Sequence, residues 1–166
     1  MSLTGRTVGK YMKCQITDSG VTLRDIFVTS INGVGITYPE TSVTALQDVL
    51  NGFLAGQGTV ALTLTSPFSN LAASVASGTG AAPSESGFYT VMAPLAGLMV
   101  PLTFAVYQGI RGYWATGDPV FGIAHTAANG VWVSAFTYDP STQMCTAKIC
   151  MYPGSAAPTW GTAALA

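Results

Sequence analysis

Apolar and polar residues alternate along much of this chain, and a period of two is typical of β-strands. The clearest example is residues 59–66, where Val60, Leu62 and Leu64 share one face and hydroxyl or small residues occupy the other. This strand is therefore expected to turn its apolar face toward a core.

Two further alternating runs, residues 131–138 and 143–152, are joined by Asp139-Pro140-Ser141-Thr142. These four residues favour a turn, so the two runs predict a β-hairpin. Alternation within the first run predicts two faces, one with Trp132, Phe136 and Tyr138 and the other with Val131, Val133 and Ala135. Both sides of the hairpin are fairly apolar, which predicts a central position or a face that another subunit covers.

A second predicted hairpin lies near the N-terminus, where residues 8–16 and 21–31 flank Thr17-Asp18-Ser19-Gly20. Three Asn-Gly pairs supply further positions that tolerate a positive φ: Asn32-Gly33, Asn51-Gly52 and Asn129-Gly130. Short strands with closely spaced turns predict a mainly β fold, an antiparallel β-sandwich or barrel.

Residues 41–54 depart from this pattern, because their apolar side chains recur at three- and four-residue spacing: Val43, Leu46, Leu50, Phe53 and Leu54. Ser42 or Thr41 is a suitable N-cap, and Gly52 or Gly56 a suitable end. The spacing predicts one short α-helix of about ten residues beside the sheet. The alternative is a loop whose leucines fill the sandwich.

Small residues dominate positions 70–86, where Glu85 is the one charged residue. A linker between two domains would leave too little chain on either side for two cores. We therefore expect a single β domain over residues 1–166, with a flexible loop at about 70–86.

The apolar stretch 88–106 is long enough to suggest a membrane span. Pro94, Gly97 and Pro101 would break a helix there, and residues 102–107 alternate as a strand does. We expect no membrane segment. The opening residues 1–6 also lack the charged start and apolar run of a signal peptide.

Charge is scarce in this chain of 166 residues and 17.1 kDa: 49% of residues are hydrophobic, only 8% are charged, and the net charge is −1. Soluble domains carry roughly 25% charged residues. A monomer of this mass exposes roughly 7,800 Å², so charges would be sparse on its surface. Partners are therefore expected to cover much of it, whereas a binder that relies on neutralising nucleic-acid phosphates is excluded.

No catalytic group of residues emerges. His125 is the only histidine, and no serine lies in a Gly-x-Ser-x-Gly motif. Cys145 and Cys150 are five residues apart on one predicted strand, so they point to opposite faces and cannot share a zinc ion with Cys14 and His125. We expect free buried thiols, no metal, no cofactor and no enzymatic activity.

Aromatic residues gather in the last 60 positions, among them Tyr107, Tyr113, Trp114, Trp132 and Trp160. Such density fits a core, a subunit interface or a sugar-binding platform. Sugar sites also need converging polar groups, so core plus interface is the favoured reading.

The order of several short motifs resembles that of the major tail tube proteins of long, non-contractile-tailed (siphovirus-like) bacteriophages. The motifs are Thr22-Leu23-Arg24-Asp25-Ile26, Ile31-Asn32-Gly33-Val34-Gly35, Val43-Thr44-Ala45-Leu46-Gln47-Asp48, Gly56-Gln57-Gly58-Thr59-Val60-Ala61-Leu62 and Phe68-Ser69-Asn70. Related phage β-sandwiches also serve as capsid decoration proteins and other virion parts.

This resemblance implies a β-sandwich with one flanking helix, whose subunits form stacked and often hexameric rings around a channel for genome ejection. Neighbouring sheets would continue across subunit boundaries. The implied place is the phage tail, after synthesis in the host cytoplasm, with other virion proteins as partners and only non-specific passage of DNA. Alternatives are a capsid decoration protein and, from the aromatic content, a carbohydrate-binding module.

The expected assembly-interface residues are drawn from the few charged residues and from large apolar or aromatic ones. They are Arg24, Asp25, Asp48, Leu50, Phe53, Tyr113, Trp114 and Trp160. Rare charges are expected to form pairs between subunits, and large aromatics are typical of interface centres.

Overall fold

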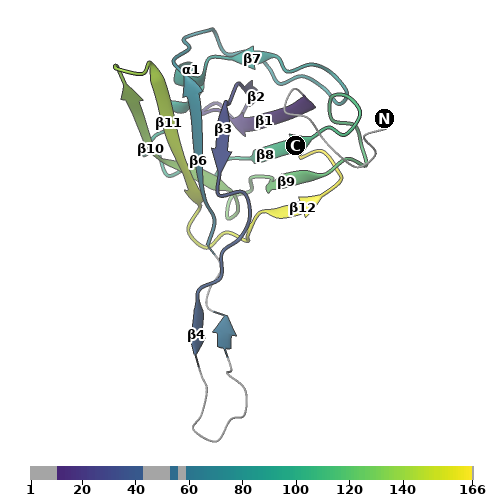
Figure 1. The fold of residues 1–166 in the computed structure, drawn as a ribbon, viewed down its shortest axis with the longest axis vertical. Helices are drawn as coiled ribbons and strands as arrows, with labels where there is room; N and C mark the ends of the chain where they lie inside the picture. Colours follow the sequence, from purple (N-terminus) through teal and green to yellow (C-terminus); the bar gives the residue numbers. More distant parts are fainter. Residues whose placement is uncertain (1–10, 43–52, 56–58, 166) are drawn as a thin grey trace, which may run out of the picture.

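Two antiparallel β-sheets pack against each other to form a sandwich, and a two-stranded hairpin projects from one end of it (Figure 1). The computed structural model describes residues 11–42, 53–55 and 59–165. The prediction of a mainly β sandwich is confirmed.

The larger sheet has six strands in the order β12-β9-β8-β1-β2-β7. All neighbours are antiparallel except β2 and β7, which are parallel. The strands are β1 (Met12–Thr17), β2 (Leu23–Ile26), β7 (Glu85–Ser86), β8 (Phe104–Gln108), β9 (Val120–Ile123) and β12 (Thr159–Gly161).

The smaller sheet has four antiparallel strands in the order β10-β11-β6-β3. They are β3 (Ser30–Asn32), β6 (Ala61–Pro67), β10 (Val131–Asp139) and β11 (Met144–Met151). In Figure 1 they run along the long axis of the molecule, and the strands of the larger sheet cross that direction. The predicted hairpin with its turn at residues 139–142 is confirmed as β10–β11.

The predicted strand over residues 21–31 is wrong as a single element, because the chain changes sheets within it. β2 ends at Ile26 in the larger sheet, and β3 begins at Ser30 in the smaller one. Ile26 is buried and Ile31 packs against the same core from the other side. Local alternation continues through such a crossing, so the sequence pattern does not reveal it.

The hydrophobic core lies between the sheets. Its largest fully buried members include Ile16, Leu62, Leu64, Phe88, Met92, Phe104, Val106 and Ile149. Val60, Leu62 and Leu64 are all buried, as their alternation predicts. Because apolar burial is the main favourable term in folding, this layer holds the two sheets together.

A β-bulge in β10 corrects the predicted faces of that strand. The pairing shifts between Val133, which is opposite Ile149, and Ala135, which is opposite Lys148. Phe136 is consequently opposite the buried Ala147 and packs against the core together with Val133. An extra residue in one strand inverts the alternation beyond it, so grouping Phe136 with Trp132 was wrong.

The helix is not where the spacing of leucines predicts it. Residues 40–42 form β4 (Glu40–Ser42) and pair in antiparallel fashion with β5 (Phe53–Ala55), so both ends of the predicted helix are strands. The intervening residues 43–52 lie outside the described part of the chain. The short helix is instead α1 (Phe88–Met92), which packs Phe88, Val91 and Met92 into the core. Tertiary pairing overrides a weak local spacing signal of this kind.

The segment after α1 does not continue as a helix. β8 begins at Phe104, which confirms the strand predicted around residues 102–107. Within the described residues, no helix is long and apolar enough to cross a membrane.

An arm connects β3 to β6 and carries the β4–β5 hairpin away from the sandwich (Figure 1). At its base, Thr37 and Thr59 exchange backbone hydrogen bonds of 2.9 and 2.8 Å. Gly33 begins this departure with a φ of +85°, and a Cβ added there would overlap the carbonyl oxygen of Ala61. The turn at Asn32-Gly33 thus requires glycine both for its backbone angle and for space.

We expect Gly33→Ala to lower the free energy of unfolding by about 2 kcal/mol, because alanine would be strained at this φ and would push against β6. Chemical denaturation measures the change. Gly112→Ala is the matched control, since nothing lies within 4 Å of a Cβ there, and it should change stability by less than about 0.5 kcal/mol. Equal effects of the two substitutions would contradict this account of the turn.

Candidate assembly surfaces

The only histidine makes structural bonds. His125 Nδ1 lies 3.0 Å from Thr103 Oγ1, and the His125 backbone N–H donates to the same oxygen at 3.0 Å. Thr103 is fully buried and its own N–H donates to Thr17 Oγ1 at 2.7 Å. This chain of bonds ties the loop after β9 to β8 and β1, and no carboxylate takes part in it.

All three cysteines are free thiols. Cys145 faces the core, whereas Cys150, five residues on in β11, is partly exposed on the opposite face, as its odd spacing predicts. Burial raises the pKa of the Cys14 thiol, and the nearby charge of Asp25 raises it further. A thiol held in its protonated form is a poor nucleophile. In the described part of the chain, no three metal-ligating side chains cluster.

Asp25 is the centre of a buried hydrogen-bond network on the larger sheet. Its side chain is fully buried and accepts four hydrogen bonds, from Gln15 Nε2 at 2.7 Å, Ser77 N at 2.8 Å, Ser77 Oγ at 2.7 Å and Ser84 N at 2.9 Å. Three of these donors belong to the small-residue segment at 70–86. The carboxylate therefore anchors that segment to β1 and β2. The flexibility of the segment stays a prediction.

Lys13 extends the same network. Its Nζ donates to Ser77 Oγ and to the Gly78 carbonyl, both at 3.0 Å. Burial lowers the pKa of Lys13, while the charge of Asp25 acts in the opposite direction. Lys13 and Asp25 are thus linked within one chain through Ser77. Sequence patterns do not indicate this link, because Ser77 is distant along the chain and one of many serines.

Arg24 forms an ion pair within its own chain, with Asp18 at 2.8 Å. Partial burial acts to raise the pKa of Asp18. The hydrogen bonds from Thr22 and Arg24, the charge of Arg24 and the Gly20 N–H outweigh it and hold that pKa below its ordinary value. The pair fixes the β1–β2 turn, and both side chains keep some exposed surface.

The aromatic interface candidates differ widely in exposure. Trp114 is only 1% exposed, and its ring centroid lies 4.9 Å from that of Tyr107. Its indole N–H donates to the Asp118 carbonyl at 2.9 Å. Tyr113 is partly buried, and its ring centroid lies 5.9 Å from that of Tyr11. Trp160, on the edge strand β12, is 56% exposed. Of these three, Trp160 leaves the most surface for a neighbouring molecule.

The remaining candidates belong to the arm region. Phe53 is the first residue of β5, and Asp48 and Leu50 lie outside the described residues. The structure therefore places Arg24 and Asp25 on β2 and Trp160 on β12, toward opposite edges of the larger sheet. The candidates that it describes do not form one surface.

The outer faces of the two sheets contrast sharply. At the centre of the larger sheet, on β1 and β8 and at Asp25 of β2, the outward side chains are at most 4% exposed, because the chain itself covers them: Lys13, Gln15, Thr17, Asp25, Ala105 and Tyr107. The 70–84 segment covers one half through Asp25, and Trp114 with Leu165 covers the other through Tyr107. The centre of this face is therefore covered by the chain itself, and its exposed positions lie on the edge strands β7 and β12.

The outer face of the smaller sheet is open and lined with hydroxyl groups. Across its four strands, paired positions form one row of hydroxyl residues: Ser30, Thr65, Thr146 and Thr137. The charged residues of these strands are Lys148, which is exposed, and Asp139 at the turn. Periodicity indicated that one side of β6 is polar, but only the strand order shows that the hydroxyl row crosses the whole sheet.

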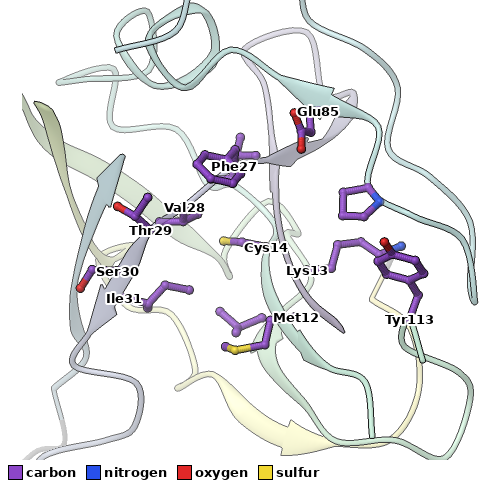
Figure 2. A pocket seen from close by; sticks show the side chains of 13 residues that line it. Met12, Lys13, Cys14, Phe27, Val28, Thr29, Ser30, Ile31, Glu85 and Tyr113 are labelled. Atoms are coloured by element: carbon purple, nitrogen blue, oxygen red, sulfur yellow. The ribbon is translucent and has the colours of Figure 1, made fainter. Parts of the chain in front are cut away.

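A cavity of about 460 Å³ opens beside β3, where the chain crosses between the sheets (Figure 2). Met12 and Cys14 lie near its centre and Phe27, which is 49% exposed, at its rim. Its lining is mostly apolar. Because Lys13 is bonded to Ser77 and Gly78, the cavity presents no converging set of polar groups, and its chemistry fits a packing contact better than catalysis.

Comparison with known proteins adds the fold relationship. No protein-family model matches the sequence, and no curated protein matches it. Among solved structures, a chain of the sheath–tube complex of an extracellular contractile injection system, PVC, in the extended state matches with a TM-score of 0.55 and 8% identity, over 98% of this chain and 95% of that one.

Two further matches come from tube ends. The sheath/tube terminator of the same PVC system has a TM-score of 0.53 and 9% identity, over 94% of this chain and 96% of its own. The tube-terminating cap of the anti-feeding prophage has a TM-score of 0.53 and 10% identity, covering 98% and 95%. The chain thus has a tail-tube-like fold over nearly its whole length. The sequence resemblance is to non-contractile tails, whereas two of these structural neighbours belong to a contractile injection system and the third to the anti-feeding prophage.

We expect Asp25→Asn to destabilise the fold by about 3 kcal/mol, because an amide group would face the Ser77 and Ser84 donors and leave them unpaired. Chemical denaturation measures the loss, and hydrogen exchange should be faster at the Ser77 and Ser84 amides. Glu85→Gln removes the same charge at a neighbouring exposed position and should be nearly neutral. Unchanged exchange at both amides in Asp25→Asn would contradict the anchoring role.

Proposed function

We propose that this chain is a structural subunit that assembles into rings, expected to be hexameric, which stack into the hollow tube of a phage tail or a related injection particle. The observation that carries the proposal is the unequal treatment of the two sheet faces, on a fold shared with tube and tube-terminator assemblies. In a phage, the channel would pass the genome. The role is structural, with no catalytic step.

The smaller sheet is suited to continue from one subunit to the next. Its outer strands are β3 and β10. Residues 97–102 bond only to the first half of β10, through Leu102 with Val131 and through the Gly97 N–H to the Val133 carbonyl. On the side away from β11, the second half of β10 has no strand partner among the described residues. Exposed strand edges favour aggregation. Closure of the sheet around a ring would pair these edges with those of neighbouring subunits.

The same sheet supplies a suitable channel wall. Its open face carries the hydroxyl row and is nearly free of charge, so it can be hydrated without binding a passing polymer tightly. The covered face of the larger sheet would then lie toward the outside of the tube. The arm extends along the direction of the smaller sheet's strands (Figure 1), so it would reach along the tube axis toward another ring.

A tube terminator is the second candidate, because two of the matched structures are terminators with TM-scores close to that of the sheath–tube chain. In that role the chain would end a tube instead of extending it, so its rings would not stack on one another. The two candidates share the fold and the ring contacts, and they differ in whether copies stack.

Imaging of the purified protein by cryo-electron microscopy tests the assignment. We expect rings at low concentration and hollow stacked tubes as the concentration rises. Rings that never stack, even at high concentration, would favour the terminator. A protein that stays monomeric throughout would overturn both candidates.

Cys150 reports which sheet faces the channel, because it is the one partly exposed thiol and lies on the open face. In isolated subunits, a small maleimide and a maleimide on a large polyethylene glycol should both label it. In tubes, only the small reagent should. In a Cys150→Ser background, Thr79→Cys on the covered side should react with both reagents in both states. Equal labelling of Cys150 by the large reagent in tubes would place the open face outside.

A further inference from the structure

Three aromatic side chains form an exposed patch, the aromatic patch, at one end of the sandwich. Phe68 follows β6, Tyr89 lies on α1 and Tyr138 lies near the end of β10; they are 41%, 44% and 40% exposed. The ring centroid of Phe68 lies 5.1 Å from that of Tyr89 and 5.3 Å from that of Tyr138. They thus form one contiguous surface.

The aromatic patch is held in place from behind. The ring centroid of Phe136 lies 6.0 Å from that of Tyr89 and 6.2 Å from that of the buried Phe88. The Tyr89 N–H donates to the Ser69 carbonyl at 3.0 Å, and the Tyr138 hydroxyl donates to Gln143 Oε1 at 2.9 Å. Side chains fixed in this way lose little entropy when a partner binds, which is the property of interface hot spots.

The carboxylate next to Tyr138 in the sequence, Asp139, forms hydrogen bonds within the β10–β11 turn. The Asp139 carboxylate accepts hydrogen bonds from the Ser141 N–H, Ser141 Oγ and Thr142 Oγ1. Leu71, 56% exposed, accepts a backbone hydrogen bond from Gly87 at the start of α1. The three rings of the patch carry no charge themselves, and exposed apolar surfaces of this kind mark interaction sites.

The position of the aromatic patch identifies its partner. α1, the end of β6 and the β10–β11 turn lie at one end of the long axis, and the β4–β5 arm projects from the opposite end (Figure 1). A contact between unlike ends of identical molecules does not close on itself along this axis, so it builds a filament. A sugar is a poorer fit, because the Tyr138 hydroxyl is already donated to Gln143 and few other polar groups converge.

We propose that the aromatic patch receives the arm-bearing end of a second copy of this chain, located in the next ring of the stack. This inference rests on the proposed tube function. It assigns the contact between rings to Phe68, Tyr89 and Tyr138, and leaves the contacts within a ring to the edges of the smaller sheet.

Tyr89→Ser tests the contact, because nearly half of this side chain is exposed and its loss leaves Phe88 and Phe136 in the core. Rings should persist, and the concentration needed for stacking should rise at least tenfold, as measured by sedimentation and negative-stain imaging. The matched control is Val75→Ser, an exposed apolar residue of the 70–86 segment, which should stack like the parent protein.

Each outcome separates the two proposals. If the parent protein forms neither rings nor tubes, the function fails and the stacking contact fails with it. If the parent protein forms tubes and Tyr89→Ser stacks at the same concentration, the patch proposal alone is overturned, and a lipid or sugar ligand for the patch becomes the explanation. Loss of rings together with tubes, in a folded Tyr89→Ser protein, would also overturn it.

A photo-crosslinking residue at position 89 covers the case in which Tyr89→Ser does not fold. In assembled tubes it should join to residues 33–42, 53–55 or 59–60 of another copy, which belong to the described part of the arm and its base. Cross-links to any other segment would overturn the proposed contact.

Discussion

One buried carboxylate determines which side of this sandwich meets its surroundings. Asp25 accepts four hydrogen bonds, three of them from the segment that lies over the larger sheet. A carboxylate removed from water needs such compensation, and here the compensation comes from backbone and hydroxyl groups distant in sequence. Because that segment covers the larger sheet, the open face belongs to the smaller one.

Four of the sparse charged side chains are linked by bonds within the chain. Lys13 and Asp25 meet through Ser77, and Arg24 pairs with Asp18 in the adjoining turn. Three of the exposed surfaces consist of uncharged side chains: the hydroxyl row on the smaller sheet, Trp160 and the aromatic patch. Neutral and apolar surfaces associate without the cost of desolvating ions, which suits a protein proposed to be surrounded by copies of itself.

The directions in the molecule fit an assembly with two kinds of contact. The open edges of β3 and β10 lie at the sides of the smaller sheet, whereas the arm and the aromatic patch lie at opposite ends of the long axis. In the proposed tube, sideways contacts would close a ring, and end-to-end contacts between unlike surfaces would extend a stack. Each set of residues can be altered without touching the other.

The sequence by itself determined the strands with strong alternation, β6, β8, β10 and β11, and the opposite faces of Cys145 and Cys150, because these depend only on the period of a strand. It misplaced the helix, missed the crossing between Ile26 and Ser30, and misassigned Phe136 beyond the bulge. It also could not join Asp25 to Ser77, or Phe68 to Tyr89. Those contacts, and which sheet face stays open, were decided only by the tertiary structure, because they depend on segments distant in sequence and on strand order, neither of which local periodicity encodes.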